Sequence, residues 1–212
     1  MAELRVKGTG TLKLFESDNT SSVTIASPAS LSADKTITLP DADVTLVSGT
    51  MATTNGITAA SQWRLTTNFT GDAAPIDSNW EEVDTDGYAT LGSSMTESSG
   101  IYTFPSTGYW LITFKLYGAC DDDEDYLVAS IHTSTNGGSN YSQAAASVSS
   151  LSPPTTFSMR YQTSTCSFMF DVTSTANCKV KFDVSSESDN GITNGNSASN
   201  YTCVTFVRLG DT

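Results

Sequence analysis

Residues 98–118 read SSGIYTFPSTGYWLITFKLYG, and no other stretch of the chain is as long or as apolar. The pattern predicts a hairpin made of a short strand, a Pro-Ser-Thr-Gly turn and a long second strand. Side chains of a strand point alternately to its two faces, so the second strand should present two different sets of residues. One face carries Trp110, Ile112, Phe114 and Leu116, and the other carries Tyr109, Leu111, Thr113, Lys115 and Tyr117. Because both faces hold large apolar groups, we expect a central strand that is at least partly covered on each side.

The composition favours an all-β protein. The chain has 212 residues, of which 38% are hydrophobic and only 16% are charged, and small polar residues fill the difference. No window shows a sustained helical period with caps. The formal net charge of -13 disfavours nucleic acid or an anionic membrane as a partner, because both would repel the protein. No apolar run is long enough to insert into a membrane, and the first residues lack the apolar core of a secretion signal.

Three regions follow one another along the chain. Residues 1–47 contain very short alternating strands and a single aromatic residue, which predicts a small β segment that cannot bury a stable core alone. We expect this segment to anchor the protein to a larger assembly through its apolar side chains. These are Val23, Ile25, Ile37, Leu39, Val44 and Leu46. Residues 48–62 are small and polar and predict a neck, whereas residues 63–212 alternate strands and turns as in a sandwich or jelly roll.

The cysteines are Cys120, Cys166, Cys178 and Cys203. Three of them alternate in phase with apolar neighbours, which is typical of buried thiols that act as small hydrophobic groups. Residues 164–172 and 177–184 predict a hairpin across Thr-Ser-Thr-Ala, and that pairing would keep Cys166 and Cys178 apart. We therefore expect all four thiols to be reduced and structural, given synthesis in the cytosol.

The stretch quoted first carries a family resemblance. Residues 100–116 resemble the pattern G-x-[YF]-x-x-P-x-x-G-x-[YW]-x-[FI]-x-[FY] of the tumour-necrosis-factor-like jelly rolls, in particular the globular heads of complement's first component. The segments YLVASIHTSTNGG (126–138) and YTCVTFVRLG (201–210) look like that family's next strand and its closing strand. The resemblance implies that residues 63–212 form a ten-stranded sandwich that trimerises. In such a trimer Tyr109, Leu111 and Tyr117 would pack against a neighbouring copy.

A second resemblance lies near the N-terminus. Residues 26–46 read ASPASLSADKTITLPDADVTL, which is similar to phrases in structural proteins of tailed bacteriophages. In those proteins such phrases precede fibre tips and receptor-binding or decoration domains. The resemblance implies a virion surface protein with an anchor, a neck and a trimeric jelly-roll head.

Residues of catalytic type are present but do not form catalytic patterns. His132 is the sole histidine, and it is out of phase with the apolar residues of its segment, so we expect a surface or interface position rather than a catalytic one. The Cys and His residues are not clustered at the spacing of zinc ligands. We therefore expect no enzymatic activity and no required cofactor.

Two polar features leave binding functions open. The first is an acidic run formed by Asp121, Asp122, Asp123, Glu124 and Asp125. These carboxylates suit either a solvated loop or oxygen ligands for calcium at a trimer axis. The second is a set of loops at 71–79, 134–142 and 185–199, with Tyr141 at one edge. Such loops suit either plain turns or recognition of a glycan on a host surface.

Together these features predict a non-enzymatic virion structural protein. Its trimeric jelly-roll head would be held on capsid or tail proteins by residues 1–47, assembled in the host cytoplasm and displayed on the virion surface. A short head fibre or capsid decoration protein and the tip of a tail fibre both fit this prediction. A bacterial carbohydrate-binding lectin module is the alternative from another class.

Overall fold

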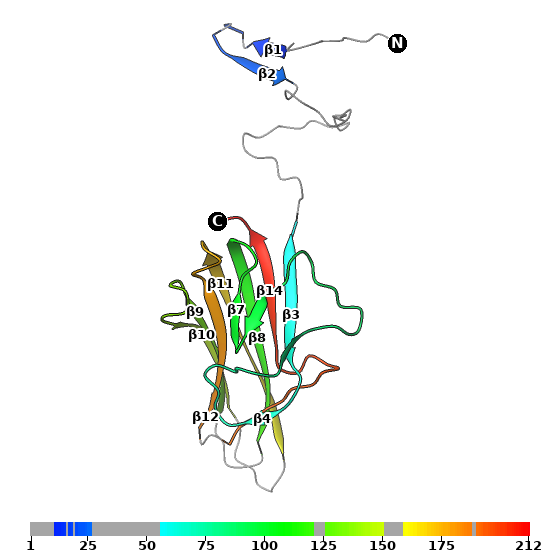
Figure 1. Ribbon diagram of the computed structural model, residues 1–212, viewed down its shortest axis with the longest axis vertical. Coiled ribbons are helices and arrows are strands. Elements are labelled where there is room, and N and C mark those ends of the chain that lie inside the picture. The colour runs from blue at the N-terminus through cyan, green and yellow to red at the C-terminus, as the bar shows by residue number, and fades with distance from the viewer. Residues whose placement is uncertain are drawn as a thin grey trace. The chain divides into compact units, whose positions relative to one another are not determined.

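The computed structural model describes residues 11–15, 17–18, 20–26, 56–120, 126–150, 159–187 and 190–212, and the elements in these ranges are all strands (Figure 1). None of the described residues belongs to a helix with the length and apolar character that a membrane crossing requires. The chain divides into two compact units, Met1–Met51 and Ala52–Thr212. The all-β prediction is confirmed for the described part of the chain.

The first unit contains an antiparallel hairpin of β1 (Thr11–Phe15) and β2 (Ser22–Ala26). Both strands were expected from their alternation. Of the predicted anchor residues, Val23 and Ile25 lie on β2, in register with Leu14 and Leu12 of β1. The remaining anchor residues Ile37, Leu39, Val44 and Leu46 lie outside the described residues.

The second unit is a sandwich of two antiparallel sheets. The five-stranded sheet has the order β10 (Ser142–Ser150), β9 (Tyr126–Ser134), β12 (Lys179–Ser186), β7 (Ile101–Thr103) and β6 (Thr96–Ser98). The seven-stranded sheet has the order β4 (Phe69–Thr70), β13 (Ile192–Thr193), β8 (Gly108–Cys120), β14 (Cys203–Gly210), β3 (Ala59–Leu65) and β5 (Trp80–Glu82), with β11 (Arg160–Val172) on the other side of β8. This arrangement confirms the predicted jelly roll.

Strand β8 is the central strand that the sequence predicts. It pairs with β11 from Gly108↔Val172 to Cys120↔Arg160 on one side, and with β14 and β13 on the other. The side chains of Trp110, Ile112, Phe114 and Leu116 are at most 1% exposed. One face of β8 is therefore buried in the core.

The hairpin predicted over residues 98–118 is wrong. The short strand β7 belongs to the five-stranded sheet and β8 to the seven-stranded one, so residues 105–107 carry the chain from one sheet to the other. Phe104 and Trp110 consequently meet across the core, with ring centroids 5.4 Å apart. The two-residue hairpin lies earlier, between β6 and β7, where Ser99 and Gly100 both have positive φ angles, as a type I′ turn requires.

The hairpin predicted from 164–172 and 177–184 is also wrong. Strand β11 pairs with β8, whereas β12 pairs with β9 and β7 in the opposite sheet. Both strands turn alternating apolar side chains inward, but they do so from opposite sheets. A short polar connection is compatible both with a hairpin inside one sheet and with a crossing from one sheet to the other, so the sequence does not distinguish the two.

The boundaries of two other segments differ from the expected ones. Strand β3 begins at Ala59, inside the range predicted as a neck. Residues 88–91 read YATL, an alternation that suits a strand, but they make only one isolated bridge, between Ala60 and Leu91.

A cluster of aromatic rings fills the space between the sheets. Tyr102 is 0% exposed, and its ring centroid lies 5.3–5.6 Å from those of Trp63, Phe182 and Phe206. Trp80 packs beside Tyr102 at 5.9 Å. Trp63 and Trp80 are therefore half-buried residues that pack against the core.

The four cysteines are buried, and none forms a disulfide. Cys120 accepts a hydrogen bond from Nη2 of Arg160 at 3.4 Å. Burial raises the pKa of the Cys166 thiol to about 11, and a backbone hydrogen bond at Ile131 offsets this only in part. Burial also raises the pKa of Cys203. The prediction of structural thiols is confirmed.

These thiols should resist alkylation while the protein is folded. At pH 8 the thiolate fraction of Cys166 would be about one in a thousand, as a pKa near 11 implies. We expect the native protein to react slowly with a thiol reagent. In guanidinium the unfolded chain should react with four equivalents of the reagent, one for each cysteine. The pKa of Cys166 is raised in the folded state from its usual value of 9.0, so folding favours the neutral thiol. The contribution of this thiol to the free energy of unfolding should be fully present below about pH 9 and should be lost as the pH rises toward 11. Fewer than four equivalents after unfolding would instead indicate a disulfide.

Candidate functional site

The face of the seven-stranded sheet that points away from the core is the first candidate for a functional surface, and we call it the outer face. Tyr109, Leu111, Thr113, Lys115 and Tyr117 of β8 lie on it, because their neighbours in sequence fill the core. Tyr109 is 40% exposed, whereas the next four are half-buried. The structure thus places all three predicted interface residues, Tyr109, Leu111 and Tyr117, on one face.

Register with the flanking strands arranges this face in rows. Met169 of β11, Leu111 of β8 and Val207 of β14 form an apolar row. Tyr109 and Leu209 lie at the same end of the strands. Met169 is 56% and Leu209 44% exposed, so this end of the face presents side chains that water solvates poorly.

An aromatic group marks the other end of the outer face. The ring of Tyr117 stacks on that of Tyr161 with centroids 5.8 Å apart and meets Tyr201 edge-on at 5.1 Å. Tyr161 is 60% and Tyr201 40% exposed. The aromatic group is therefore held in place by ring contacts while its outer surface faces solvent.

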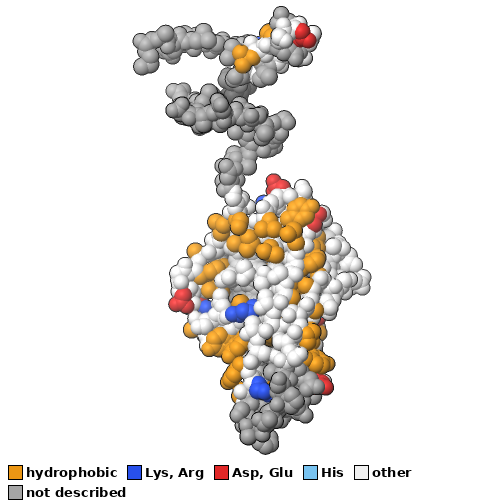
Figure 2. All heavy atoms as spheres, turned by 180° about the vertical axis from the view of Figure 1, so that it is seen from behind, with side chains coloured by type: hydrophobic (Ala, Val, Ile, Leu, Met, Phe, Trp, Pro, Cys, Tyr) orange, Lys and Arg blue, Asp and Glu red, His pale blue; other side chains and the backbone are white. Residues whose placement is uncertain are grey.

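A polar band separates the two ends. Thr113 lies opposite Ser167 and Thr205, and its hydroxyl is 3.1 Å from that of Ser167. Lys115 donates from Nζ to the carbonyl oxygen of Asn200 at 2.6 Å. Figure 2 shows the same division on one side of the domain, with orange hydrophobic patches above and below a paler band. Exposed apolar patches at both ends of one sheet face are typical of a surface that another protein covers.

The sequence reasoning missed half of this face. The apolar neighbours in phase with Cys166 predicted the inward side of β11, whereas the opposite phase, with Met169 and Tyr161, was left unassigned. The signal was present, since an alternating strand that carries apolar side chains in both phases is covered on both faces or binds a partner. What the sequence could not show is that β11 lies next to β8.

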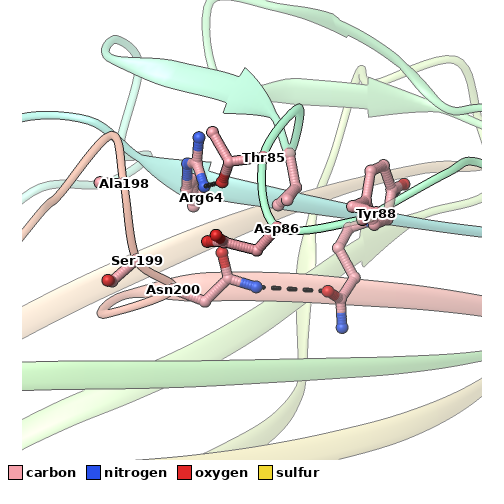
Figure 3. Close-up of a pocket in the computed structure, with 10 residues that line it drawn as sticks. Arg64, Thr85, Asp86, Tyr88, Ala198, Ser199 and Asn200 are labelled. Atoms are coloured by element: carbon pink, nitrogen blue, oxygen red, sulfur yellow. Dashed lines mark hydrogen bonds between the residues drawn. The ribbon is translucent and has the colours of Figure 1, made fainter.

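A pocket of about 480 Å³ lies where β3 approaches two loops. Residues 62, 64, 83, 85–88 and 198–200 line it. Figure 3 shows Arg64, Thr85, Asp86 and Tyr88 on one side and Ala198, Ser199 and Asn200 on the other. No sequence motif pointed to this site, because its residues are polar and come from distant parts of the chain.

Arg64 is a buried charge beside this pocket. Its side chain is 1% exposed, and its Nε lies 2.7 Å from Glu81 and its Nη2 2.8 Å from Asp84. Its Nη1 donates to Oγ1 of Thr85 at 2.9 Å. All three nitrogens of the guanidinium are thus engaged, and two carboxylates compensate its charge.

His132 lies on the outward side of the five-stranded sheet, as expected from its phase. Its Nε2 is 3.3 Å from Asp183, whose carboxylate also pairs with Lys181 at 3.1 Å. Burial lowers the pKa of His132 below its usual value; the Asp183 carboxylate acts in the opposite direction, and Lys181 adds to the lowering. Among the described residues, its ion-pair partner is Asp183, which is a carboxylate and not a catalytic nucleophile of the serine or cysteine type.

Tyr141, a predicted ligand-binding residue, is engaged within the protein. Nζ of Lys181 lies 5.4 Å from the centroid of its ring, and the residue does not line the pocket beside Arg64. The predicted calcium ligands Asp121, Asp122, Asp123, Glu124 and Asp125 lie outside the described residues. Among the residues that are described, no group of three or more His, Cys, Asp or Glu side chains is placed to hold a metal ion.

Comparison with solved structures identifies the fold. The structure of Eiger TNF from S. frugiperda aligns with a TM-score of 0.54 at 15% identity, over 74% of this chain and 96% of that one. The crystal structure of murine APRIL at pH 8.5 aligns with a TM-score of 0.50 at 10% identity, over 71% of this chain and 98% of that one. No family model and no curated protein matches the sequence. At these identities the likeness is one of fold, and it confirms the tumour-necrosis-factor-like jelly roll expected from residues 100–116.

The Arg64 cluster should contribute strongly to stability. We expect Arg64→Ala to lower the free energy of unfolding by about 3 kcal/mol, because it leaves Glu81 without its buried partner. Asp84→Ala is the matched control. Since the Asp84 side chain is 73% exposed, its loss should cost less than about 1 kcal/mol. Urea denaturation measures both, and equal losses would contradict a dominant role for the buried guanidinium.

Proposed function

We propose that this protein is a non-enzymatic structural protein of a virus particle and that its jelly-roll head forms a homotrimer through the outer face of the seven-stranded sheet. The observation that carries the trimer is the apolar row of Met169, Leu111 and Val207, continued by exposed Tyr109 and Leu209. A closed trimer would remove these side chains from water on all three copies at once. The family resemblance of residues 100–116 supports the same stoichiometry.

The proposed role in a virion is supported by different residues. The phrase at 26–46 resembles segments of tailed-bacteriophage structural proteins. The chain also has a small unit, Met1–Met51, separate from the head, and the hairpin in it leaves Leu14 and Phe15 more than half exposed. Such a unit suits attachment to other virion proteins. In this proposal the chain is assembled in the host cytoplasm and displayed on the particle as a short head fibre or decoration protein.

Two alternatives keep the same head. A tail-fibre tip would use it to contact the host surface, and a bacterial lectin module would use it to bind carbohydrate. The net charge of -13 argues against nucleic acid as a partner in each case. The mounting site separates the first two, since density for the head would lie on the capsid or on the tail.

Light scattering of the full chain tests the trimer. We expect a mass three times the 22.4 kDa of one chain. Met169→Lys should weaken association by about tenfold or more at each interface, because it places a charge in the apolar row. Since Met169 is 56% exposed, the substitution should leave the fold intact by circular dichroism. Val148→Lys is the matched control, because Val148 is 61% exposed on the other sheet and should leave the trimer unchanged.

A wild-type monomer would contradict the trimer, as would a trimer that survives Met169→Lys. The virion role is tested separately, by electron cryo-microscopy of particles decorated with an antibody against residues 56–212. We expect label on purified particles, at the capsid for a head fibre or decoration protein. A particle preparation that contains none of the chain would contradict a structural role.

A further inference from the structure

The pocket beside Arg64 has a size and a lining that suit a small polar ligand. Its volume of about 480 Å³ falls in the range of about 300–1,000 Å³ typical of small-molecule sites. Apolar and polar surface contribute to its wall in similar measure: Val83 and Tyr88 are the larger apolar contributors, and most of the other side chains add amide, hydroxyl or charged groups. A lining of this kind favours a ligand with many hydrogen-bonding groups over a lipid or an aromatic compound.

Hydrogen bonds hold the walls of the pocket in place. The hydroxyl of Tyr88 accepts the backbone N–H of Gln62 at 2.9 Å and lies 3.3 Å from Oε1 of Glu82. Across the pocket, Nδ2 of Asn200 donates to Oε1 of Gln62 at 3.2 Å. The two loops are therefore tied to the same residue of β3, and binding would require little additional ordering.

The charge of the pocket excludes anions. The single positive charge of Arg64 is already shared between Glu81 and Asp84, so it does not leave a site for phosphate or carboxylate. Asp86 adds another carboxylate to the pocket lining. Within the described residues, no hydrogen bond or ion pair engages the Asp86 side chain, and the excess charge is negative.

The backbone presents this carboxylate to the pocket. Asp86 has a φ of 57° and Gly87 a φ of 78°, in a turn closed by a 3.1 Å hydrogen bond from Tyr88 N to Thr85 O. A left-handed conformation costs a residue other than glycine roughly 1 kcal/mol. In Figure 3 Asp86 comes from the loop that carries Thr85, and its carboxylate is directed across the pocket toward Asn200.

We propose that this pocket binds an uncharged saccharide, with Asp86 and Asn200 as its principal polar contacts. An ionised carboxylate accepts two O–H groups, and a side-chain amide both donates and accepts, which matches adjacent hydroxyls on a sugar ring. Hydrogen bonds from hydroxyls to a carboxylate are short and charge-assisted. The biological role of this site rests on the proposed display of the head at the surface of a virus particle, where it could reach saccharides of a host, whereas the binding itself does not require that role.

Saccharide binding by the full chain tests this proposal. An array of uncharged and anionic saccharides is screened first, and the dissociation constant of the tightest uncharged saccharide is then measured by calorimetry. Asp86→Asn removes the charge but keeps the turn, because asparagine tolerates positive φ. We expect it to raise the dissociation constant about tenfold or more. Asp77→Asn is the matched control, since Asp77 is exposed and does not line the pocket, and it should bind as the wild type does.

Three results would overturn the saccharide site: no saccharide bound at millimolar concentration, a preference for anionic saccharides, or unchanged affinity in Asp86→Asn. Light scattering of the same samples keeps the two proposals apart. A trimer that binds no saccharide overturns the pocket and leaves the assembly standing. A monomer whose saccharide affinity falls in Asp86→Asn supports the pocket and overturns the trimer.

Discussion

The pairing of β8 with strands on both of its edges is the constraint on which the rest of the structure depends. Thirteen residues of β8 pair with β11, while β14 and β13 pair along its other edge. A shift of one residue would move Trp110 and Phe114 out of the core and Tyr109 and Leu111 into it. The register that buries the aromatic cluster therefore also fixes which side chains the outer face presents.

The pairing of β8 determines both proposed binding surfaces, the outer face and the pocket beside Arg64. The apolar row of the outer face is a direct result of register, since β11 and β14 bring Met169 and Val207 to either side of Leu111. The pocket lies toward the β3 edge of the same outer face, because Gln62 and Arg64 are in register with Thr205 and Cys203 of β14, which are in register with Thr113 and Lys115 of β8. A homotrimer would use the first surface and a saccharide the second.

Much of the fold could be predicted from local alternation, and the errors share one cause. The strands at Gly108–Cys120, Tyr126–Ser134 and Cys203–Gly210 were all expected from their patterns. Both predicted hairpins failed because a short polar connection joins strands of opposite sheets as readily as neighbours in one sheet. The alternation of a strand shows which of its residues face the core, but it does not show to which of the two sheets the strand belongs.

The candidate site residues also differ in whether the alternation of a single strand could predict them. Tyr109, Leu111 and Tyr117 could be predicted because they alternate with core residues within one strand. Met169 and Tyr161 required knowledge that β11 lies beside β8, and Asp86 and Asn200 required the approach of two loops from distant parts of the chain. His132 was placed correctly by its phase, while its contact with Asp183 depends on the pairing of β9 with β12.

The most direct measurement of the central claim is a crystal structure of the full chain in the assembly that it forms in solution. The account predicts three copies around one axis, with the row of Met169, Leu111 and Val207 buried against a neighbouring copy. Copies joined through the five-stranded sheet, or a monomer with the outer face open to solvent, would contradict it.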